Sequence, residues 1–163
     1  MLKEVQKYIE NQNLIVGEAP VLVGLSGGAD SVALLSVLLR LEYTCIAVHC
    51  NFHLREEESD RDELFASELA ESLNVAFYKI DFDTIQYARK HALSVEMAAR
   101  ELRYSWFEEM RQQLGAQAIA VAHHQDDNTE TLLLNLIRGT GIRGLSGIRP
   151  KNGYVIRPLL SVN

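Results

Sequence analysis

The stretch VLVGLSGGADSVALL, residues 21–35, decides the fold. An apolar, β-branched run is followed by two adjacent glycines and an aspartate, after which the chain becomes apolar again. Adjacent glycines weaken a strand or a helix, but they permit positive φ angles and let the backbone approach a ligand closely. The pattern therefore predicts a buried strand over 21–25, a turn, and a helix over 31–41.

The turn SGGADS, residues 26–31, is interpreted as a phosphate-binding loop. The helix after it offers unpaired N–H groups and the positive end of its dipole to an anion. The loop lacks the GK[ST] of a Walker motif and the GxGxxG of dinucleotide-binding proteins. A carboxylate beside a phosphate is repulsive unless a metal ion lies between them, so Asp30 indicates Mg²⁺. The alternative is an ordinary strand-to-helix turn in which Asp30 caps the helix.

Short apolar strands alternate with helices along the rest of the chain. Further strands are expected at 44–50, 75–80, 118–123 and 154–160, and further helices at 2–15, 59–73, 84–91, 95–114 and 126–139. In the helix at 59–73, Ser59 is expected as the cap, and the apolar side is expected to consist of Leu64, Phe65, Leu69 and Leu73. The buried stripe of the helix at 95–114 is expected to consist of Val95, Ala98, Ala99, Leu102, Trp106 and Met110.

This alternation predicts one α/β domain over residues 1–163, with a mainly parallel sheet and helices on both faces. The length of 163 residues suits a single domain. In such sheets, ligands bind beyond the carboxyl ends of the strands. The polar motifs of the chain follow the predicted strands, so we expect them to gather at one edge of the sheet.

The net charge of −6 argues against a generally basic nucleic-acid binder. The charge is uneven, however, because residues 55–63 are strongly acidic, whereas residues 131–163 contain no Asp or Glu. That last segment carries five basic side chains: Arg138, Arg143, Arg149, Lys151 and Arg157. One edge of the molecule is therefore suited to a polyanion, with a merely solvated basic face as the alternative.

The chain contains no apolar run long enough to cross a membrane and no signal peptide at its N-terminus, so a cytoplasmic location is expected. Cys45 and Cys50 lie five residues apart in a predicted strand, so their side chains point to opposite faces. This disfavours a disulfide or a shared metal ion and predicts two free, buried thiols.

Four motifs follow the first loop. His49, Asn51 and His53 alternate after the second strand and are expected to bind a nucleotide, with surface histidines as the alternative and zinc disfavoured. Glu96, Arg100 and Arg103 share one helix face, where a solvated salt-bridge row is the alternative. The segment HHQDDNTET, residues 123–131, suits a divalent ion or a cationic substrate, although capping explains one of its aspartates. The glycine-rich segment 138–148 is interpreted as a basic loop for a phosphate backbone or triphosphate, with a merely flexible connection as the alternative.

In combination and in this order, these motifs resemble a known family. SGGADS looks like the PP-loop of ATP pyrophosphatases, and HCNFHLR, EMAARELRY, HHQDDNTET and LLNLIRGTGIRGLSGI resemble the tRNA(Ile)-lysidine synthases. The resemblance implies an adenine nucleotide alpha hydrolase-like fold, with ATP and Mg²⁺ as cofactors. It also implies a two-step reaction. ATP adenylates the ring carbonyl of the wobble cytidine in a CAU anticodon of tRNA(Ile), and free L-lysine then displaces AMP to give lysidine.

The resemblance also implies roles for single residues. The ATP phosphates would bind the loop, which consists of Ser26, Gly27, Gly28, Ala29, Asp30 and Ser31. The adenosine pocket would be bordered by His49, Asn51 and His53. Asp30 would help to position Mg²⁺, and Asp126 and Asp127 would complete the metal site or bind the lysine ammonium group, supported by Glu130. Arg100 and Arg103 would contact the activated cytidine or the phosphates. The remaining substrate-binding candidates are Glu96, Glu130, Arg138 and Arg143.

Two departures from the family are visible. Asn128 stands where the family usually has Gln, and the chain stops at RPLLSVN, where family members continue into tRNA-binding domains. We therefore expect a truncated catalytic domain that binds ATP but modifies tRNA weakly or not at all by itself. Another PP-loop enzyme such as a tRNA thiolase is one alternative, although the two cysteines lack CxxC spacing. A non-catalytic nucleotide-binding module is the other, and a homodimer is left open.

Overall fold

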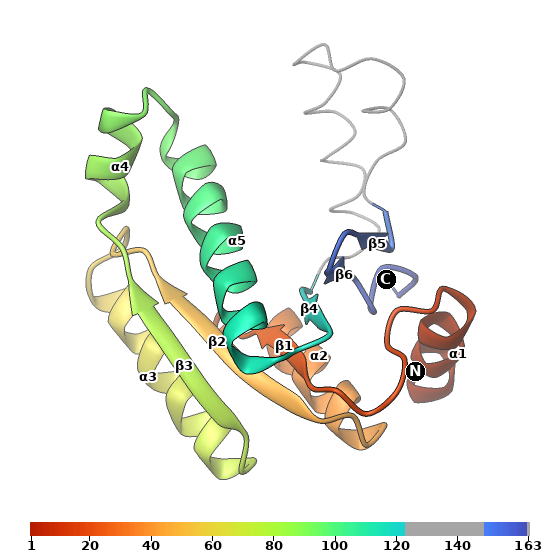
Figure 1. The fold of residues 1–163 in the computed structure, drawn as a ribbon. Helices are drawn as coiled ribbons and strands as arrows, with labels where there is room; N and C mark the ends of the chain where they lie inside the picture. The colour runs from red at the N-terminus through yellow and green to blue at the C-terminus, as the bar shows by residue number, and fades with distance from the viewer. Residues whose placement is uncertain (123–148, 163) are drawn as a thin grey trace.

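The computed structural model describes residues 1–122 and 149–162. Its elements in chain order are α1 (Leu2–Asn11), β1 (Val21–Gly24), α2 (Ala29–Arg40), β2 (Cys45–Asn51), α3 (Glu57–Ser72), β3 (Ala76–Asp81), α4 (Thr84–Lys90), α5 (Val95–Leu114), β4 (Ala118–Ala120), β5 (Lys151–Asn152) and β6 (Val155–Ile156). The strands form one sheet in the order β3-β2-β1-β4-β6-β5, as Figure 1 shows. All neighbouring strands run parallel except β5 and β6. The predicted α/β fold with a mainly parallel sheet is confirmed.

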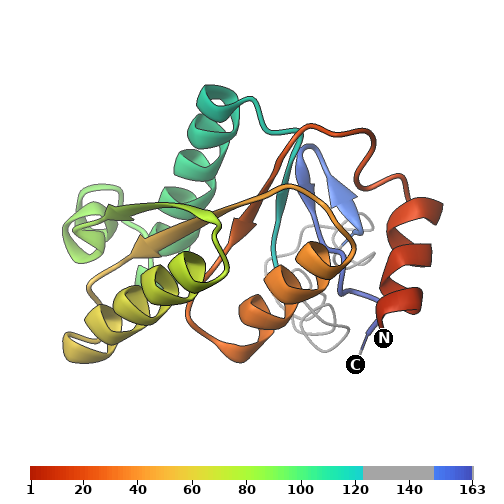
Figure 2. The ribbon, with the colours of Figure 1, turned by 90° about the horizontal axis from the view of Figure 1, so that it is seen from below.

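Helices cover both faces of the sheet. Figure 2 shows α2 and α3 on one side and α5 on the other. Strand β2 separates the two sides: Cys45 and Ala47 belong to the hydrophobic cluster under α2 and α3, whereas Val48 and Cys50 pack in the cluster under α5. Alternate residues of a strand point to opposite faces, so this strand packs against helices on both of them. The expected opposite orientation of two free thiols is confirmed, but only Cys45 is buried, whereas Cys50 is half-buried.

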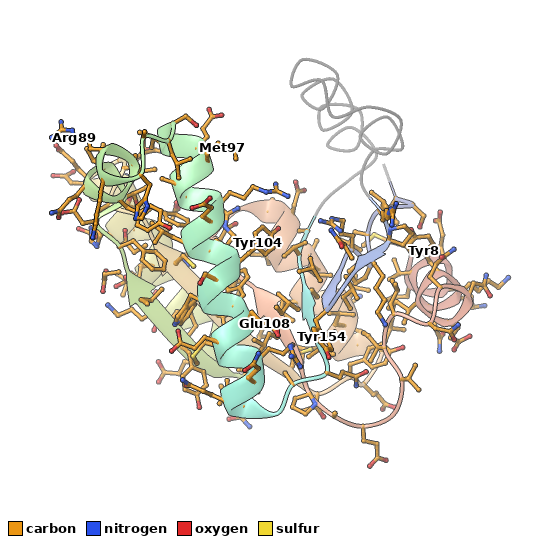
Figure 3. All side chains as sticks on the ribbon, turned by 45° about the horizontal axis from the view of Figure 1, so that its top comes forward. Tyr8, Arg89, Met97, Tyr104, Glu108 and Tyr154 are labelled. Carbon is orange, nitrogen blue, oxygen red and sulfur yellow. The ribbon has the colours of Figure 1, made fainter. Side chains whose placement is uncertain are left out.

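The prediction of the last strand was wrong in its length. Instead of a strand over 154–160, the structure has a short antiparallel hairpin in which β5 pairs with β6. Gly153, with φ +61, lies in its turn. After Ile156 the chain leaves the sheet, because Pro158 has no N–H to donate to a neighbouring strand. Tyr154 of the hairpin lies beside the last turns of α5, near Glu108 (Figure 3). Arg111 holds it there, with its guanidinium carbon 3.5 Å from the ring centroid of Tyr154.

The apolar face predicted for α3 was wrong except at Leu69, which packs against the core, and Leu73 is exposed. Leu64 is 59% exposed and Phe65 is 46% exposed, whereas Ala66 and Ala70 are fully buried. The helix turns its small residues toward the sheet, because a methyl group lets a helix lie close to the strands it covers. Ser59 is not the cap, since the helix begins at Glu57; its hydroxyl accepts a hydrogen bond from the N–H of Arg55 (3.1 Å).

Helix α5 was predicted with its observed bounds. It begins after Ser94, whose hydroxyl accepts from the N–H of Met97 (3.1 Å), and it ends at Gly115, which has a left-handed φ of +66. Its buried side chains are Ala98, Ala99, Trp106, Phe107 and Met110. Two members of the expected stripe differ: Val95 lies exposed at the first turn, and Leu102 is only half-buried. No helix within the described ranges is long and apolar enough to cross a membrane.

Candidate functional site

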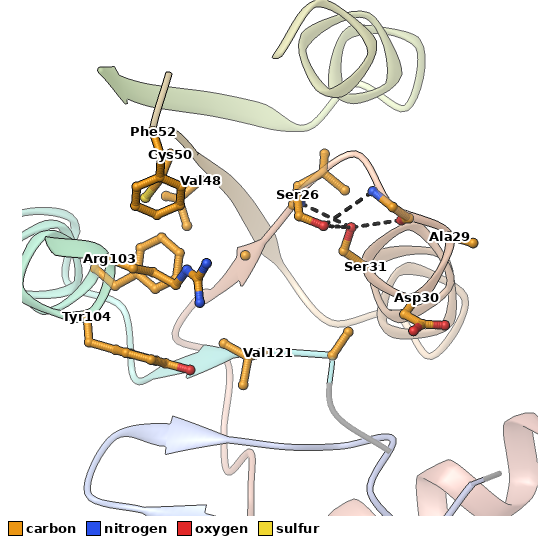
Figure 4. A pocket seen from close by; sticks show the side chains of 15 residues that line it. Ser26, Ala29, Asp30, Ser31, Val48, Cys50, Phe52, Arg103, Tyr104 and Val121 are labelled. Atoms are coloured by element: carbon orange, nitrogen blue, oxygen red, sulfur yellow. Dashed lines mark hydrogen bonds between the residues drawn. The ribbon is translucent and has the colours of Figure 1, made fainter. Parts of the chain in front are cut away.

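The loop between β1 and α2 is fixed by two serine hydroxyls. The hydroxyl of Ser31 donates to the carbonyl of Gly28 (3.0 Å) and accepts from the N–H of Ser26 (3.1 Å). The N–H of Gly28 donates to the hydroxyl of Ser26 (3.3 Å), and the two hydroxyl oxygens lie 3.1 Å apart (Figure 4). The loop is therefore held in one shape from within, before any ligand binds.

Gly27 supplies the backbone conformation that this loop requires. Its φ is +96, a value that residues with a side chain rarely adopt. A Cβ atom at this position would also lie 3.0 Å from the Cβ of Asp62 in α3. The glycine thus serves both the turn and the close approach of α3.

Asp30 is not the cap of α2. The cap position is occupied by Gly28, which forms no side-chain capping hydrogen bond, and Asp30 is the second residue of the helix. The alternative interpretation of this loop as an Asp-capped turn is therefore wrong. The exposed carboxylate lies in the first turn of α2, where the N–H groups have no acceptors within the helix.

Two adjoining cavities lie beside this loop, at the carboxyl ends of β1 and β2. The first has a volume of about 360 Å³ and an apolar floor that includes Val48, Phe107 and Val121. The second has a volume of about 810 Å³ and lies between α3 and α5. Five residues line both cavities: Ser26, Gly28, Cys50, Phe52 and Arg103. The loop and Arg103 thus form the boundary between the two.

The predicted face of α5 lines the second cavity. Glu96, Arg100 and Arg103 all border it, so the structure brings these three side chains together. The alternative salt-bridge row is not formed, because the described part of the chain contains no ion pair between Glu96 and Arg100. The guanidinium of Arg100 lies instead over the ring of Tyr104, at 5.4 Å from its centroid.

His49 is buried in the wall of the second cavity. It is 3% exposed, and its Nδ1 lies 2.7 Å from the carbonyl oxygen of Leu25. A carbonyl oxygen only accepts, so Nδ1 carries the proton and Nε2 of the neutral ring is an acceptor. Among the described residues, Nε2 has no hydrogen-bond partner.

Asn51 lies next along the same face of β2 and is 2% exposed. Its amide nitrogen donates to Asp60 and to Glu63, each at 3.2 Å. Its amide oxygen accepts from the N–H of His53 (3.0 Å). Asn51 therefore connects the end of β2 to α3, besides lining the second cavity.

His53 lies apart from the other two members of its motif. It borders a third, smaller cavity of about 270 Å³, together with Asp81. Its Nε2 lies 2.7 Å from a carboxylate oxygen of Asp81, and this hydrogen bond lowers the pKa of Asp81. His53 therefore contacts Asn51 only through its backbone N–H, and its side chain is not brought together with His49 in the second cavity.

Five predicted site residues lie outside the described residues: Asp126, Asp127, Glu130, Arg138 and Arg143. The described segments contain no group of three or more His, Cys, Asp or Glu side chains arranged to hold a metal ion. Asp30 nevertheless fits Mg²⁺, which often takes one or two carboxylates and completes its shell with phosphate and water. Its carboxylate offers the hard oxygen ligand this ion prefers, at the edge of a loop suited to phosphate.

The sequence did not single out Tyr104 and Phe52, which line the first cavity, or the buried Arg157 near Tyr104. Arg157 is 5% exposed, and burial lowers its pKa; it donates to the carbonyl of Arg149 (3.0 Å) and lies near Tyr104 and Arg100. The available signal was an arginine within the apolar run YVIRPLL, where a solvated charge is not expected. Tyr104 and Phe52 gave no such signal, because aromatic residues in these positions fit an ordinary core.

Relatives among curated proteins support one enzyme family. A protein named tRNA(Ile)-lysidine synthase from Parabacteroides distasonis is 71% identical over 163 residues, which is 100% of this chain and 37% of that protein. Proteins of the same name from Bacteroides thetaiotaomicron and Chlorobaculum tepidum are 57% and 43% identical, with 38% and 50% of their lengths covered. The chain thus spans about a third to a half of the length of these relatives.

Solved structures with a similar fold are more distant. The U34-tRNA thiolase NcsA from Methanococcus maripaludis superposes with a TM-score of 0.72 at 17% identity, covering 99% of this chain and 59% of that chain. The NH3-dependent NAD synthetase from Campylobacter jejuni gives a TM-score of 0.64 at 18% identity, covering 99% and 66%. At these identities the likeness concerns the fold. A family model described as the PP-loop domain matches residues 1–163, so the chain belongs to the PP-loop domain family, whose fold binds ATP.

Proposed function

We propose that residues 1–163 form the catalytic PP-loop domain of a tRNA(Ile)-lysidine synthase. The observation that carries this proposal is the pair of adjoining cavities that share the loop and Arg103. A reaction that joins a nucleotide to a second substrate needs two compartments that meet at the transferred phosphate. The identity of 71% to a curated lysidine synthase supports the choice of substrates.

The proposed reaction has two steps. In the first, the ring carbonyl oxygen of the wobble cytidine attacks the α-phosphorus of ATP, and the bond to pyrophosphate breaks. In the second, the ε-amine of lysine attacks the activated ring carbon and loses a proton, and AMP leaves with the bonding electron pair. Both steps require the cytidine and the α-phosphate to meet at the boundary of the two cavities.

The loop holds the phosphates in this proposal. Backbone N–H groups at the start of α2 bind the anion, with the hydroxyl of Ser26 beside them, because helix N-termini favour negative charge. Asp30, with Asp126, would hold Mg²⁺, which neutralises phosphate charge when it is bound. The rigid Ser26–Ser31 hydrogen bonds keep these donors in place, so less order has to be gained on binding.

The second cavity holds the acceptor substrates. Arg100 and Arg103 supply positive charge for the adenylated cytidine, and Glu96 supplies negative charge for the lysine ammonium group. Asp127 and Glu130 would add carboxylates for lysine, and Arg138 and Arg143 would contact the tRNA backbone. His49 would border the substrates there, since it lines this cavity and not the first.

The thiolase alternative is disfavoured by the cysteines. Cys50 lines both cavities, but burial raises its pKa to about 12, although the nearby Arg103 charge opposes this. Burial likewise raises the pKa of Cys45 to about 12, and both thiols are free. A thiol with such a pKa is protonated near neutral pH and is a poor nucleophile.

Transfer of labelled lysine tests the proposal. The protein in its natural length is incubated with ATP, Mg²⁺, radiolabelled lysine and an unmodified tRNA(Ile) transcript with a CAU anticodon. We expect label in the transcript, and none in a matched transcript in which the wobble cytidine is replaced by uridine. Absence of label from both transcripts, or equal label in both, would contradict the proposal.

A further inference from the structure

Phe52 and Arg103 form a cation–π pair at the boundary of the two cavities. The guanidinium carbon of Arg103 lies 5.2 Å from the ring centroid of Phe52, and both residues line both cavities. Figure 4 shows the Arg103 side chain reaching from α5 into the middle of the pocket, with Phe52 above it and the loop on the opposite side. The pair therefore lies where the two substrates of the proposed reaction meet.

An aromatic face holds an arginine without occupying its hydrogen-bond donors. The attraction acts between the cation and the ring's quadrupole, so the five N–H groups in the guanidinium plane remain able to bind oxygen. A carboxylate partner would instead occupy those donors and neutralise the charge. Within residues 1–122 and 149–162, Arg103 forms no ion pair with a carboxylate.

Arg111, two turns further along α5, shows the contrasting arrangement. Its guanidinium also lies over a ring, that of Tyr154, but its Nε donates to Glu108 (2.7 Å) and its Nη1 to the carbonyl of Ala116 (3.2 Å). The donors of Arg111 are thus used within the protein, as befits an arginine that holds the hairpin. Arg103 has the aromatic contact without the carboxylate.

The ring of Phe52 is itself fixed from outside the cavities. It stacks on Phe82 with centroids 5.8 Å apart and an interplanar angle of 21°. Its carbonyl accepts a hydrogen bond from the hydroxyl of Thr84 (2.8 Å), a residue that is 1% exposed. The connection between β3 and α4 therefore determines where the aromatic face lies, and through it where Arg103 lies.

We infer that Phe52 is a positioning residue that holds the Arg103 guanidinium at the boundary of the two cavities, with its donors available to the phosphates of ATP. The inference rests on the proposed function, because it names the group that Arg103 binds. It assigns to Phe52 no contact with the reacting atoms. Its effect on ATP acts through Arg103 alone.

A double-mutant cycle on ATP binding tests this inference. Affinity of Mg-ATP is measured by calorimetry for the unchanged chain, Phe52→Leu, Arg103→Ala and the double variant. Loss of a cation–π contact predicts that Phe52→Leu weakens ATP binding by about twofold to about thirtyfold. In the Arg103→Ala background the same change is expected to have no further effect.

Matched variants separate positioning from structure. Phe52→Tyr keeps the aromatic face and is expected to bind ATP within about twofold of the unchanged chain. Phe65→Leu makes the same chemical change at an exposed site that lines neither cavity, and is expected to change nothing. If Phe52→Leu does not fold, as judged by circular dichroism, Phe52→Met replaces it in the cycle.

The inference is overturned if Phe52→Leu binds ATP as tightly as the unchanged chain. It is also overturned if Phe52→Leu causes an equal loss in the Arg103→Ala background, because a general structural defect would act without Arg103. Lysine transfer by the natural-length protein is measured separately. Its absence would contradict the proposed function, while the ATP affinities would still decide the role of Phe52.

Discussion

Gly27 and Asp62 are packed so closely that a Cβ atom on the glycine would lie 3.0 Å from the Cβ of the aspartate. The first residue belongs to the loop and the second to α3, so the loop and the wall of the second cavity fix each other. Together with its φ of +96, this contact gives Gly27 two reasons to be glycine. Neighbouring Gly28 has neither a positive φ nor such a close contact. Its φ is −81, and the nearest atom to a Cβ would be the Ser26 hydroxyl at 3.5 Å.

Replacing Gly27 by alanine is therefore expected to destabilise the fold and weaken ATP binding. Holding a residue with a side chain in this φ region costs about 1–3 kcal/mol of unfolding free energy, and the contact with Asp62 adds to that. Gly28→Ala is expected to cost less than about 1 kcal/mol. Urea unfolding of both variants measures the difference, and equal costs at the two positions would refute the argument.

Asp30→Asn separates the metal-binding role of Asp30 from simple phosphate binding. Without its charge, the residue no longer attracts Mg²⁺, so lysine transfer is expected to fall by about a hundredfold. Binding of metal-free ATP is expected to be unchanged or tighter, because a repulsive carboxylate has been removed. Glu68→Gln, an exposed change on α3, serves as the control. Weaker metal-free ATP binding by Asp30→Asn would show that the carboxylate does not act through a cation.

The two thiols are expected to resist alkylation in the folded protein. Burial raises the pKa of both Cys45 and Cys50 to about 12, so almost no thiolate is present at pH 8. Iodoacetamide is expected to label neither residue under native conditions and both in denaturant, as read by mass spectrometry. Fast native labelling of Cys50 would reopen the sulfur-transfer alternative.

The pair of His53 and Asp81 predicts a small stability change at acid pH. The hydrogen bond from His53, followed by that from Lys79, lowers the pKa of Asp81 below its usual 3.8. Stability from a lowered carboxyl pKa is present above pH 3.8 and is lost as the pH falls through the folded-state value. The carboxylate is half exposed, so Asp81→Asn is expected to cost less than about 1 kcal/mol near neutral pH.

Urea unfolding from pH 6 down to the acid limit of the native state checks this prediction. The difference in unfolding free energy between the unchanged chain and Asp81→Asn should shrink below about pH 4, where the aspartate becomes protonated. Asp83→Asn, which alters a helix cap two residues away, provides a comparison. A difference that grows toward acid pH would contradict the assignment.

The elements with strong local signals could be predicted from the sequence. Helix α5 has a serine cap and a terminal glycine, and the SGGADS loop lies between an apolar strand and an apolar helix. The face of α3 could not be predicted, because its large apolar residues and its alanines compete and only packing against the sheet decides between them. The dipeptide Asn152-Gly153 is a local signal for the short hairpin of β5 and β6, but the pairing of β6 with β4 joins segments far apart in the sequence and has no local signal.

The edge of the sheet at which the candidate site lies could be predicted from the sequence, but the arrangement of the side chains within the site could not. Loop residues, His49 and the α5 arginines were expected at the strand ends, and they line the cavities there. The separation of His53 from His49 follows from its φ of +51, which turns the chain away from the strand. Phe52 was missed because its contact with Arg103 joins two elements far apart in the sequence.

The most direct test of the central claim is the fate of ATP during lysine transfer. The natural-length protein is supplied with lysine, Mg²⁺, the CAU-anticodon transcript and ATP labelled at the α-phosphate. The amount of labelled AMP and ADP formed and the amount of lysine incorporated are measured in the same reaction. The account predicts one AMP per lysine incorporated, and no AMP when the transcript is omitted. Formation of ADP in place of AMP, or AMP release unrelated to lysine incorporation, would contradict it.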